Sequence, residues 1–420
     1  MQAVLYRGTC TRKKYGSSIF SKKAQRVLLK NNCRYDKMLY DMEKEKQNIA
    51  FFYLKTGGGH FAGARAVSER MTELYPDIAC VTKDAFETGV PFSKTFAEKG
   101  YALTTNYFQR GYVLFYQITN AKPVLDYVYN RLQGFFNPLL RKFLLEHNIT
   151  KIVSFHEILT PYLVNTVAQL KTKIPIISVV MDPFTAHNSW FYSKDLILIV
   201  FSKYLQAKAI NEFGYAPESV HCFAPILSKQ FDCSYSESKK ADIRRNLNIP
   251  DDKKVLLIAG GGEGLKNAGE ILTKFLDKKF NDSIIIVCGK NKRLKQRLEK
   301  IVKKYNADHV IIFGFVNFMP DLMNIANCVI SKGGPGTIME TLRIAKPLII
   351  CDFVRGQEYG NVFYVEQHRV GWYLRDPEKI YAKVSEIFTS PEIEAEIKAR
   401  IQSLELKNGL DDIVKFIAEN

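Results

Sequence analysis

The sequence lacks several features that would assign it to particular classes of protein. No stretch approaches eighteen consecutive apolar residues, so a transmembrane helix is not expected. The N-terminal region is basic but no apolar run follows it, so a secretory signal peptide is not expected either. The eight cysteines are scattered without metal-type pairs, and several lie in strand-like runs. Such usage is typical of buried, reduced thiols in a cytosolic protein.

Acidic residues are scarce relative to basic ones. The 420 residues include 60 Lys and Arg against 43 Asp and Glu, a formal net charge of +17. Residues 1–46 hold twelve basic and four acidic side chains without a clear period, which predicts a basic N-terminal arm. This charge suits an anionic lipid surface or nucleic acid, with AT-rich coding as the alternative explanation. No motif for reading bases is present, so nucleic acid is not an expected partner.

From Asn48 onward, short apolar runs alternate with amphipathic segments, in a chain too long for one ordinary core. The first series of expected strands is Ile49–Leu54, Ile78–Val81, Lys151–Phe155, Ile174–Met181 and Leu196–Phe201. The second is Val255–Ala259, Ile284–Cys288, Val310–Phe313, Cys328–Ile330 and Leu348–Cys351. Strands of this kind, with helices between them, predict two Rossmann-like, doubly wound α/β domains that face a cleft.

The composition also predicts domain boundaries. The basic arm covers 1–46, an N-terminal domain 47–225, a C-terminal domain 226–380, and C-terminal helices 381–420. Within the first domain, residues 101–145 hold eleven aromatic residues interleaved with basic ones. Aromatic and basic residues together suit a membrane interface or a lipid groove. A helical subdomain that packs its own core is the alternative.

A glycine motif, Lys55 to His60, follows the first expected strand and leads into a helix. Its glycines, Gly58 and Gly59 among them, bring the backbone close to a substrate. The helix dipole at this position disfavours an imidazolium, so a neutral His60 is suited to act as a general base. The spacing is not the G-x-G-x-x-G of dinucleotide sites. A structural histidine in the turn is the alternative.

A polar and aromatic segment, Asp182 to Trp190, follows the fourth expected strand. Open parallel sheets bind ligands at the carboxyl ends of their strands, so this is a site position. Asp182 or His187 is expected to orient an acceptor or to assist His60. The alternative is a capping aspartate beside a core Trp190.

The second half carries two glycine segments suited to a diphosphate. Gly260–Gly264, with Gly261 and Gly262, can bind phosphate through backbone N–H groups. Gly334, Gly336 and Thr337 open the expected helix Thr337–Ile344, whose N-terminus presents unpaired donors and a positive dipole end. These segments predict a nucleotide diphosphate site.

Three further features suit the other parts of a nucleotide-sugar. Glu340, one helical turn beyond the glycines, could accept hydrogen bonds from ribose hydroxyls. Phe315 can stack on a base while the Val316 backbone reads its edge. Finally, the amides and the carboxylate of Gln357, Glu358 and Asn361 suit sugar hydroxyls.

The order and spacing of these five motifs resemble the monogalactosyldiacylglycerol synthase family over about residues 48–375. This family is related to the processive diacylglycerol glucosyltransferases and to the lipid II-forming N-acetylglucosaminyltransferase. The resemblance implies a GT-B fold, a UDP-sugar donor and a lipid acceptor at a membrane surface. Gly-Gly-Pro-Gly-Thr and Gly-Gln-Glu-Tyr-Gly-Asn resemble the galactolipid synthases more than the glucosyltransferases, which favours galactose over glucose.

Carried over to matching positions, the resemblance implies a role for each candidate residue. His60 is the catalytic base, with Asp182 as the second candidate, and Gly58, Gly59, His187 and Trp190 lie on the acceptor side. The donor residues are Gly261, Gly262, Phe315, Val316, Gly334, Gly336, Thr337, Glu340, Gln357, Glu358 and Asn361.

The sequence therefore predicts an inverting transferase that moves a hexose from a UDP-sugar to diacylglycerol and needs no cofactor or tightly held metal. Anionic membrane lipids are expected partners, with the protein peripheral on the inner face of the cell membrane. One alternative is a UDP-N-acetylglucosamine-using GT-B enzyme, either a lipid-linked acceptor transferase or an epimerase. The other is a non-catalytic nucleotide-sugar-binding protein.

Overall fold

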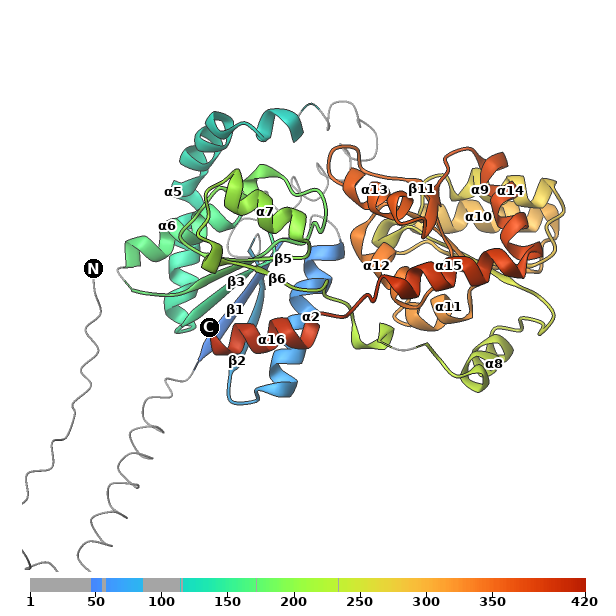
Figure 1. The fold of residues 1–420 in the computed structure, drawn as a ribbon, viewed down its shortest axis with the longest axis horizontal. Helices are drawn as coiled ribbons and strands as arrows, with labels where there is room; N and C mark the ends of the chain where they lie inside the picture. The colour runs from blue at the N-terminus through green and yellow to red at the C-terminus, as the bar shows by residue number, and fades with distance from the viewer. Residues whose placement is uncertain (1–46, 55–57, 86–113, 115, 171, 233) are drawn as a thin grey trace, which may run out of the picture. The chain divides into compact units, whose positions relative to one another are not determined.

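Two six-stranded parallel sheets form the frame of the protein (Figure 1). The computed structural model describes residues 47–54, 58–85, 114, 116–170, 172–232 and 234–420. Both sheets belong to one unit, Asn48–Asn420. Three predicted features lie outside the described residues: the basic arm, residues 55–57 of the first glycine motif, and residues 101–113 and 115 of the aromatic-rich segment.

The first sheet has the strand order β2-β1-β3-β4-β5-β6, with parallel neighbours throughout. Its strands are β1 (Asn48–Tyr53), β2 (Ala79–Asp84), β3 (Lys151–Ser154), β4 (Ile176–Val179), β5 (Ile197–Val200) and β6 (Val220–Cys222). Alternate residues of β1 enter two different cores, with Phe51 on one side and Phe52 on the other. The continuous apolar run of this strand is explained by burial on both faces.

Helices cover both faces of this sheet. On the Phe52 side lie α5 (Lys122–Glu146) and α6 (Thr160–Leu170), which contribute Phe136 and Tyr162 to the core. On the Phe51 side lies α2 (Gly58–Leu74). The remaining elements of this half are α7 (Lys203–Asn211) and the short 3₁₀ helices η2 (Asn188–Phe191) and η3 (Pro217–Ser219).

The second sheet has the order β12-β11-β10-β7-β8-β9 and is also parallel throughout. Its strands are β7 (Val255–Ala259), β8 (Ser283–Val287), β9 (Val310–Phe313), β10 (Cys328–Lys332), β11 (Leu348–Asp352) and β12 (Gly371–Tyr373). Its helices are α8 (Glu237–Asn246), α9 (Ala268–Asp277), α10 (Lys292–Tyr305), α11 (Met319–Ile325), α12 (Pro335–Arg343), α13 (Tyr359–Gln367), α14 (Pro377–Thr389) and α15 (Pro391–Ser403), with 3₁₀ turns η4 (Lys229–Phe231) and η5 (Gly261–Glu263).

The last helix, α16 (Leu410–Glu419), packs on the first sheet rather than on the second. Its apolar stripe, including Ile413 and Ile417, is fully buried against Phe51 of β1 and Met71 of α2. Lys151 of β3 donates a hydrogen bond from Nζ to the Ile417 carbonyl oxygen at 2.6 Å. The chain therefore crosses between the two sheets twice.

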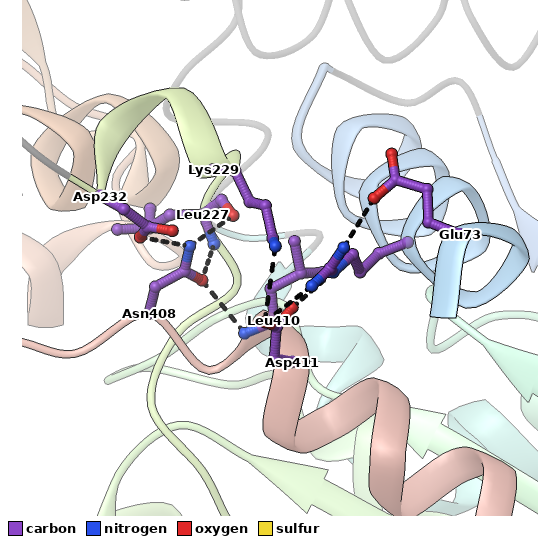
Figure 2. A network of polar contacts seen from close by, with 8 residues as sticks. Glu73, Leu227, Lys229, Asp232, Asn408, Leu410 and Asp411 are labelled. Carbon is purple, nitrogen blue, oxygen red and sulfur yellow. Dashed lines mark hydrogen bonds and ion pairs between the residues drawn. The ribbon is translucent and has the colours of Figure 1, made fainter. Parts of the chain in front are cut away.

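Polar contacts fix the second crossing (Figure 2). Asn408 Nδ2 donates to the Leu227 carbonyl and to Asp232 Oδ1, and Asn408 Oδ1 accepts from the backbone N–H groups of Leu227 and Leu410. Beside it, the Arg70 guanidinium of α2 makes two hydrogen bonds to the Asp411 carboxylate at 2.7 and 3.0 Å. Hydrogen bonds thereby hold the second crossing segment, at Asn408, to the first crossing segment, at Leu227 and Asp232. The Arg70–Asp411 pair holds α16 to α2.

All ten expected strands are present, and two more, β6 and β12, contain only three residues each. The helix expected at Gly63–Leu74 begins earlier, at Gly58, so Gly58 and Gly59 are helical residues. The polar stretch expected to join the halves contains α8, and its Phe231 and Ile249 enter the core of the second sheet. No helix within the described ranges is both long and apolar enough to cross a membrane.

Candidate active site

The predicted site segments follow the carboxyl ends of parallel strands, as expected for ligand sites in such sheets. In the first half they follow β1 and β4. In the second half they follow β7, β9, β10 and β11.

His60 lies in the first turn of α2 and is oriented by the end of β3. Its Nδ1 lies 2.6 Å from the Phe155 carbonyl oxygen, which only accepts, so Nδ1 carries the hydrogen and Nε2 keeps its lone pair. Burial and the neighbouring His156 lower the pKa of His60 to about 4, although Glu157 and the Phe155 carbonyl oppose the shift. The imidazole is therefore neutral at pH 7, with the protonation state and tautomer of a general base.

The segment after β3 contributes two neighbours of His60 that were not predicted from the sequence. They are His156 and Glu157. The ring centroids of His60 and His156 are 4.5 Å apart. His156 Nδ1 lies 3.2 Å from a Glu157 carboxylate oxygen, and burial lowers the pKa of His156 to about 3. Their position directly after the expected strand Lys151–Phe155 was the available signal, since ligands gather at strand carboxyl ends.

Asp182, after β4, is buried and both of its oxygens accept hydrogen bonds. Trp190 Nε1 donates to Oδ2 at 3.1 Å, and Gln357 Nε2 donates to Oδ1 at 3.4 Å. Burial, followed by the charge of Glu157, raises the pKa of Asp182 to about 7 against the effect of these hydrogen bonds. Trp190 is fully buried and stacks on His60 at a centroid distance of 6.2 Å.

His187 has partners inside the protein at both ring nitrogens. Its Nδ1 accepts from the Ser189 backbone N–H at 3.2 Å, and its Nε2 lies 3.2 Å from the Tyr116 carbonyl oxygen. The imidazole thus caps the turn Asn188–Phe191. Burial lowers its pKa.

The glycine loop after β7 has a backbone that side chains would disturb. Gly261 and Gly264 have positive φ angles of 73° and 69°, which favour glycine. Lys290 N donates to the Gly262 carbonyl at 2.7 Å and fixes the loop against the turn after β8. Lys332, which ends β10, places its Cε 3.8 Å from where a Cβ on Gly261 would lie. The cationic side chain of Lys332 thus lies beside the loop.

The second glycine segment opens α12. Gly334 is the N-cap, no side chain caps the helix, and a Cβ on Gly336 would meet no atom within 4 Å. The first N–H groups of α12, including that of Thr337, therefore face an open approach suited to an anion. Burial raises the pKa of Glu340, one turn further on, to about 7.

The remaining donor candidates differ in their surroundings. The Phe315 ring is 66% exposed, with Lys290 Nζ 5.9 Å from its centroid, while Val316 is half-buried. Glu358 accepts from the Val354 N–H at 2.7 Å, and Asn361 donates to the Gly333 carbonyl at 2.8 Å. Asn361 thus supports the glycine segment and Glu358 the turn after β11, whereas Phe315 offers an open aromatic face.

Comparison with known proteins finds a family match in each half of the chain. Residues 60–225 match the monogalactosyldiacylglycerol (MGDG) synthase model, and residues 255–413 match the glycosyltransferase family 28 C-terminal domain. Monogalactosyldiacylglycerol synthase 2, chloroplastic, from Arabidopsis thaliana is 28% identical over 386 residues, which cover 89% of this chain and 81% of that relative.

The first half of the chain thus resembles the monogalactosyldiacylglycerol synthases, and the second half the family 28 glycosyltransferases.

Solved structures share the GT-B fold of this chain. A glycosyltransferase from Rickettsia africae covers 90% of this chain and 100% of its own, with a TM-score of 0.55 and 14% identity. A UDP-GlcNAc 2-epimerase from Neisseria meningitidis, bound to UDP-GlcNAc, covers 89% and 98%, with a TM-score of 0.55 and 14% identity. The expected pair of Rossmann-like domains is confirmed.

The structure brings part of the predicted site together. His60, Trp190, Asp182 and Gln357 form a continuous series of contacts. Within the described residues, His60, His156 and Glu157 also bring their ligand atoms within 4.8 Å of one another, close enough to hold a metal ion. The sequence-based expectation of no metal stays a prediction.

Proposed function

We propose that the protein transfers a hexose, galactose in preference to glucose, from a UDP-sugar to the sn-3 hydroxyl of diacylglycerol, with inversion at the anomeric carbon. The observation that carries the proposal is a neutral His60 with a hydrogen-bonded Nδ1, in a chain whose curated relatives are named monogalactosyldiacylglycerol synthases. Galactose is favoured by those names and by the glycine motifs.

The proposed chemistry uses His60 as the base. The acceptor oxygen forms a bond to the anomeric carbon while the bond from that carbon to the UDP oxygen breaks, and the acceptor proton passes to His60 Nε2. Asp182 is the weaker candidate because both of its oxygens already accept hydrogen bonds. UDP would leave toward the N-terminus of α12, the loop at Gly261 and Lys332, whose positive charge stabilises the diphosphate.

Replacing the base gives a direct test. His60→Ala is expected to lower glycolipid formation by roughly 10²–10⁴-fold, the usual contribution of a positioned general base. A variant that keeps near-normal turnover would rule out this assignment. Because α12 and Lys332 supply the positive charge, activity is also expected to persist after treatment with EDTA.

The donor side is proposed to bind the nucleotide through separate groups. Uracil would stack on the exposed ring of Phe315, and the ribose hydroxyls would donate to Glu340. Gln357, Glu358 and Asn361 would read the sugar. A UDP-N-acetylglucosamine enzyme remains the alternative, because the Neisseria epimerase shares the fold; the names of the curated relatives favour diacylglycerol.

Action at a membrane surface is proposed from one face of α5. Val128, Leu132 and Phe135 are exposed at helical spacing and form one stripe, beside the exposed Tyr127. Arg131 lies over the Tyr127 ring at 5.9 Å. An apolar stripe with basic neighbours suits an anionic lipid surface, to which each basic residue adds about 1 kcal/mol.

The membrane proposal has a matched control. Leu132→Asp is expected to lower binding to anionic liposomes, whereas Tyr204→Asp, at an exposed aromatic position on α7, is expected to leave it unchanged. Wild-type binding is expected to weaken as salt rises; binding indifferent to both salt and Leu132→Asp would contradict the proposal. Which membrane is used stays a prediction, since the inner face of the cell membrane was expected and the relatives are named chloroplastic.

The deciding experiment offers diacylglycerol in anionic liposomes with UDP-galactose and UDP-glucose in separate reactions. A new glycolipid from one donor establishes the reaction class and names the sugar. No product from either donor, together with measured UDP binding, would move the proposal to another acceptor or to the epimerase reaction.

A further inference from the structure

A line of contacts joins the candidate base to a candidate sugar-reading residue. Trp190 stacks on His60, its Nε1 donates to Asp182 Oδ2 at 3.1 Å, and Asp182 Oδ1 accepts from Gln357 Nε2 at 3.4 Å. Asp182 follows β4 of the first sheet and Gln357 follows β11 of the second. The two are 175 residues apart in sequence.

Neighbouring contacts fix this junction. Gly360 N donates to Thr185 Oγ1 at 2.8 Å, and a Cβ on Gly360 would overlap that hydroxyl oxygen. The rings of Phe184 and Tyr364 stack at 4.2 Å with an interplanar angle of 13°. The segment that carries Asp182 is therefore docked closely on the segment that carries Gln357.

The chemistry of a carboxylate dictates how the Gln357 amide is turned. An ionised carboxylate accepts hydrogen bonds and cannot donate them, so the NH₂ group of Gln357 must face Asp182. The carbonyl oxygen Oε1 is then turned away from Asp182. Trp190 Nε1 can only donate a hydrogen bond, so the other oxygen of Asp182 must also be an acceptor.

We propose that Asp182 is a positioning residue that sets the orientation of the Gln357 amide, and through it the choice of donor sugar. This inference rests on the proposed use of Gln357 to read the sugar. In the wild type, Oε1 of Gln357 accepts a hydrogen bond from a sugar hydroxyl. Of the two hexoses, the one whose hydroxyl lies within reach of Oε1 is therefore preferred.

The variant Asp182→Asn separates this role from catalysis. Trp190 Nε1 requires an acceptor, so the oxygen of the new amide faces Trp190 and its NH₂ group faces Gln357. The Gln357 amide must then turn over, which presents NH₂ instead of Oε1 to the sugar. The sugar hydroxyl that donates to Oε1 in the wild type would then have to accept from NH₂, and its own O–H would lose its acceptor. This loss is expected to change the ratio of affinities for UDP-galactose and UDP-glucose by about tenfold.

The experiment measures both dissociation constants by calorimetry at pH 8, where Asp182 is ionised, and kcat/KM for each donor. A changed ratio in Asp182→Asn, and none in Trp190→Phe, supports the inference. In a Gln357→Ala background, Asp182→Asn should change the ratio no further, since the effect acts through Gln357.

Other results overturn the inference. An equal loss of kcat on both donors with unchanged affinities would make Asp182 catalytic, and an unchanged ratio at normal turnover would make the junction purely structural. A ratio that still changes in the Gln357→Ala background would remove Gln357 from the argument. Donor affinities are measured without an acceptor, so failure of the diacylglycerol assay alone would count against the proposed function only.

Discussion

Replacing Asp182 should change how the stability of the protein depends on pH. In the folded protein, burial raises the pKa of this carboxyl from 3.8 to about 7. Between these values the folded state holds a proton that the unfolded state has lost. The contribution of Asp182 to stability is therefore greatest below pH 4 and falls as pH rises toward 7. At about 1.4 kcal/mol per pKa unit, the total change is about 4 kcal/mol, of which about 3 kcal/mol falls between pH 5 and 8.

Asp182→Asn removes this titration while it keeps the size of the side chain. The difference in unfolding free energy, wild type minus variant, is therefore expected to fall by about 3 kcal/mol from pH 5 to pH 8. Urea unfolding followed by tryptophan fluorescence suits the measurement, because Trp190, one of only two tryptophans, contacts Asp182 directly. A difference that stays constant across this range would refute the raised pKa and the desolvation argument behind it.

Three further comparisons test other parts of the structure. Phe315→Ala should raise KM for the UDP-sugar roughly tenfold with little change in kcat, since base stacking contributes about 1–3 kcal/mol; steady-state kinetics check this. Gly360→Ala should lower the unfolding midpoint because its Cβ has no room, whereas Gly134→Ala, in open space on α5, should raise stability by about 0.5–1 kcal/mol. Ile413→Ala, fully buried in α16, should cost about 2–5 kcal/mol in urea unfolding, and Asp411→Asn, at a partly exposed ion pair, at most about 1 kcal/mol.

Local pattern predicted the sheets well, because strands such as Val255–Ala259 are apolar at every position and their burial leaves little choice of structure. It did not reveal β6 and β12, since three residues are too few to form a recognisable run. The amphipathic pattern of α16 predicts a helix, but nothing in its own sequence specifies that its partner is the first sheet.

The site shows the same limit. Glycine motifs at strand ends could be found from the sequence because their backbone requirements are local. The partners of Asp182 could not, since Gln357 lies 175 residues away and only the fold brings them together. His156 and Glu157 were missed for a different reason: their position directly after a strand was the only signal, without a motif around it, and the fold alone sets them against His60.

The return of α16 to the first sheet has a consequence for synthesis on the ribosome. The buried residues of the second sheet's two cores all lie between Leu227 and Ile401, so this half has its whole core available before α16 is made. The Phe51 side of the first sheet has only the cover of α2 until residues 410–417 emerge, and Arg70 meets its partner in α16 across 341 residues. Domains usually fold in the order of their synthesis. Here the half that is made first should be the last to be completed, and its partly covered apolar face should be the principal target for chaperones during translation.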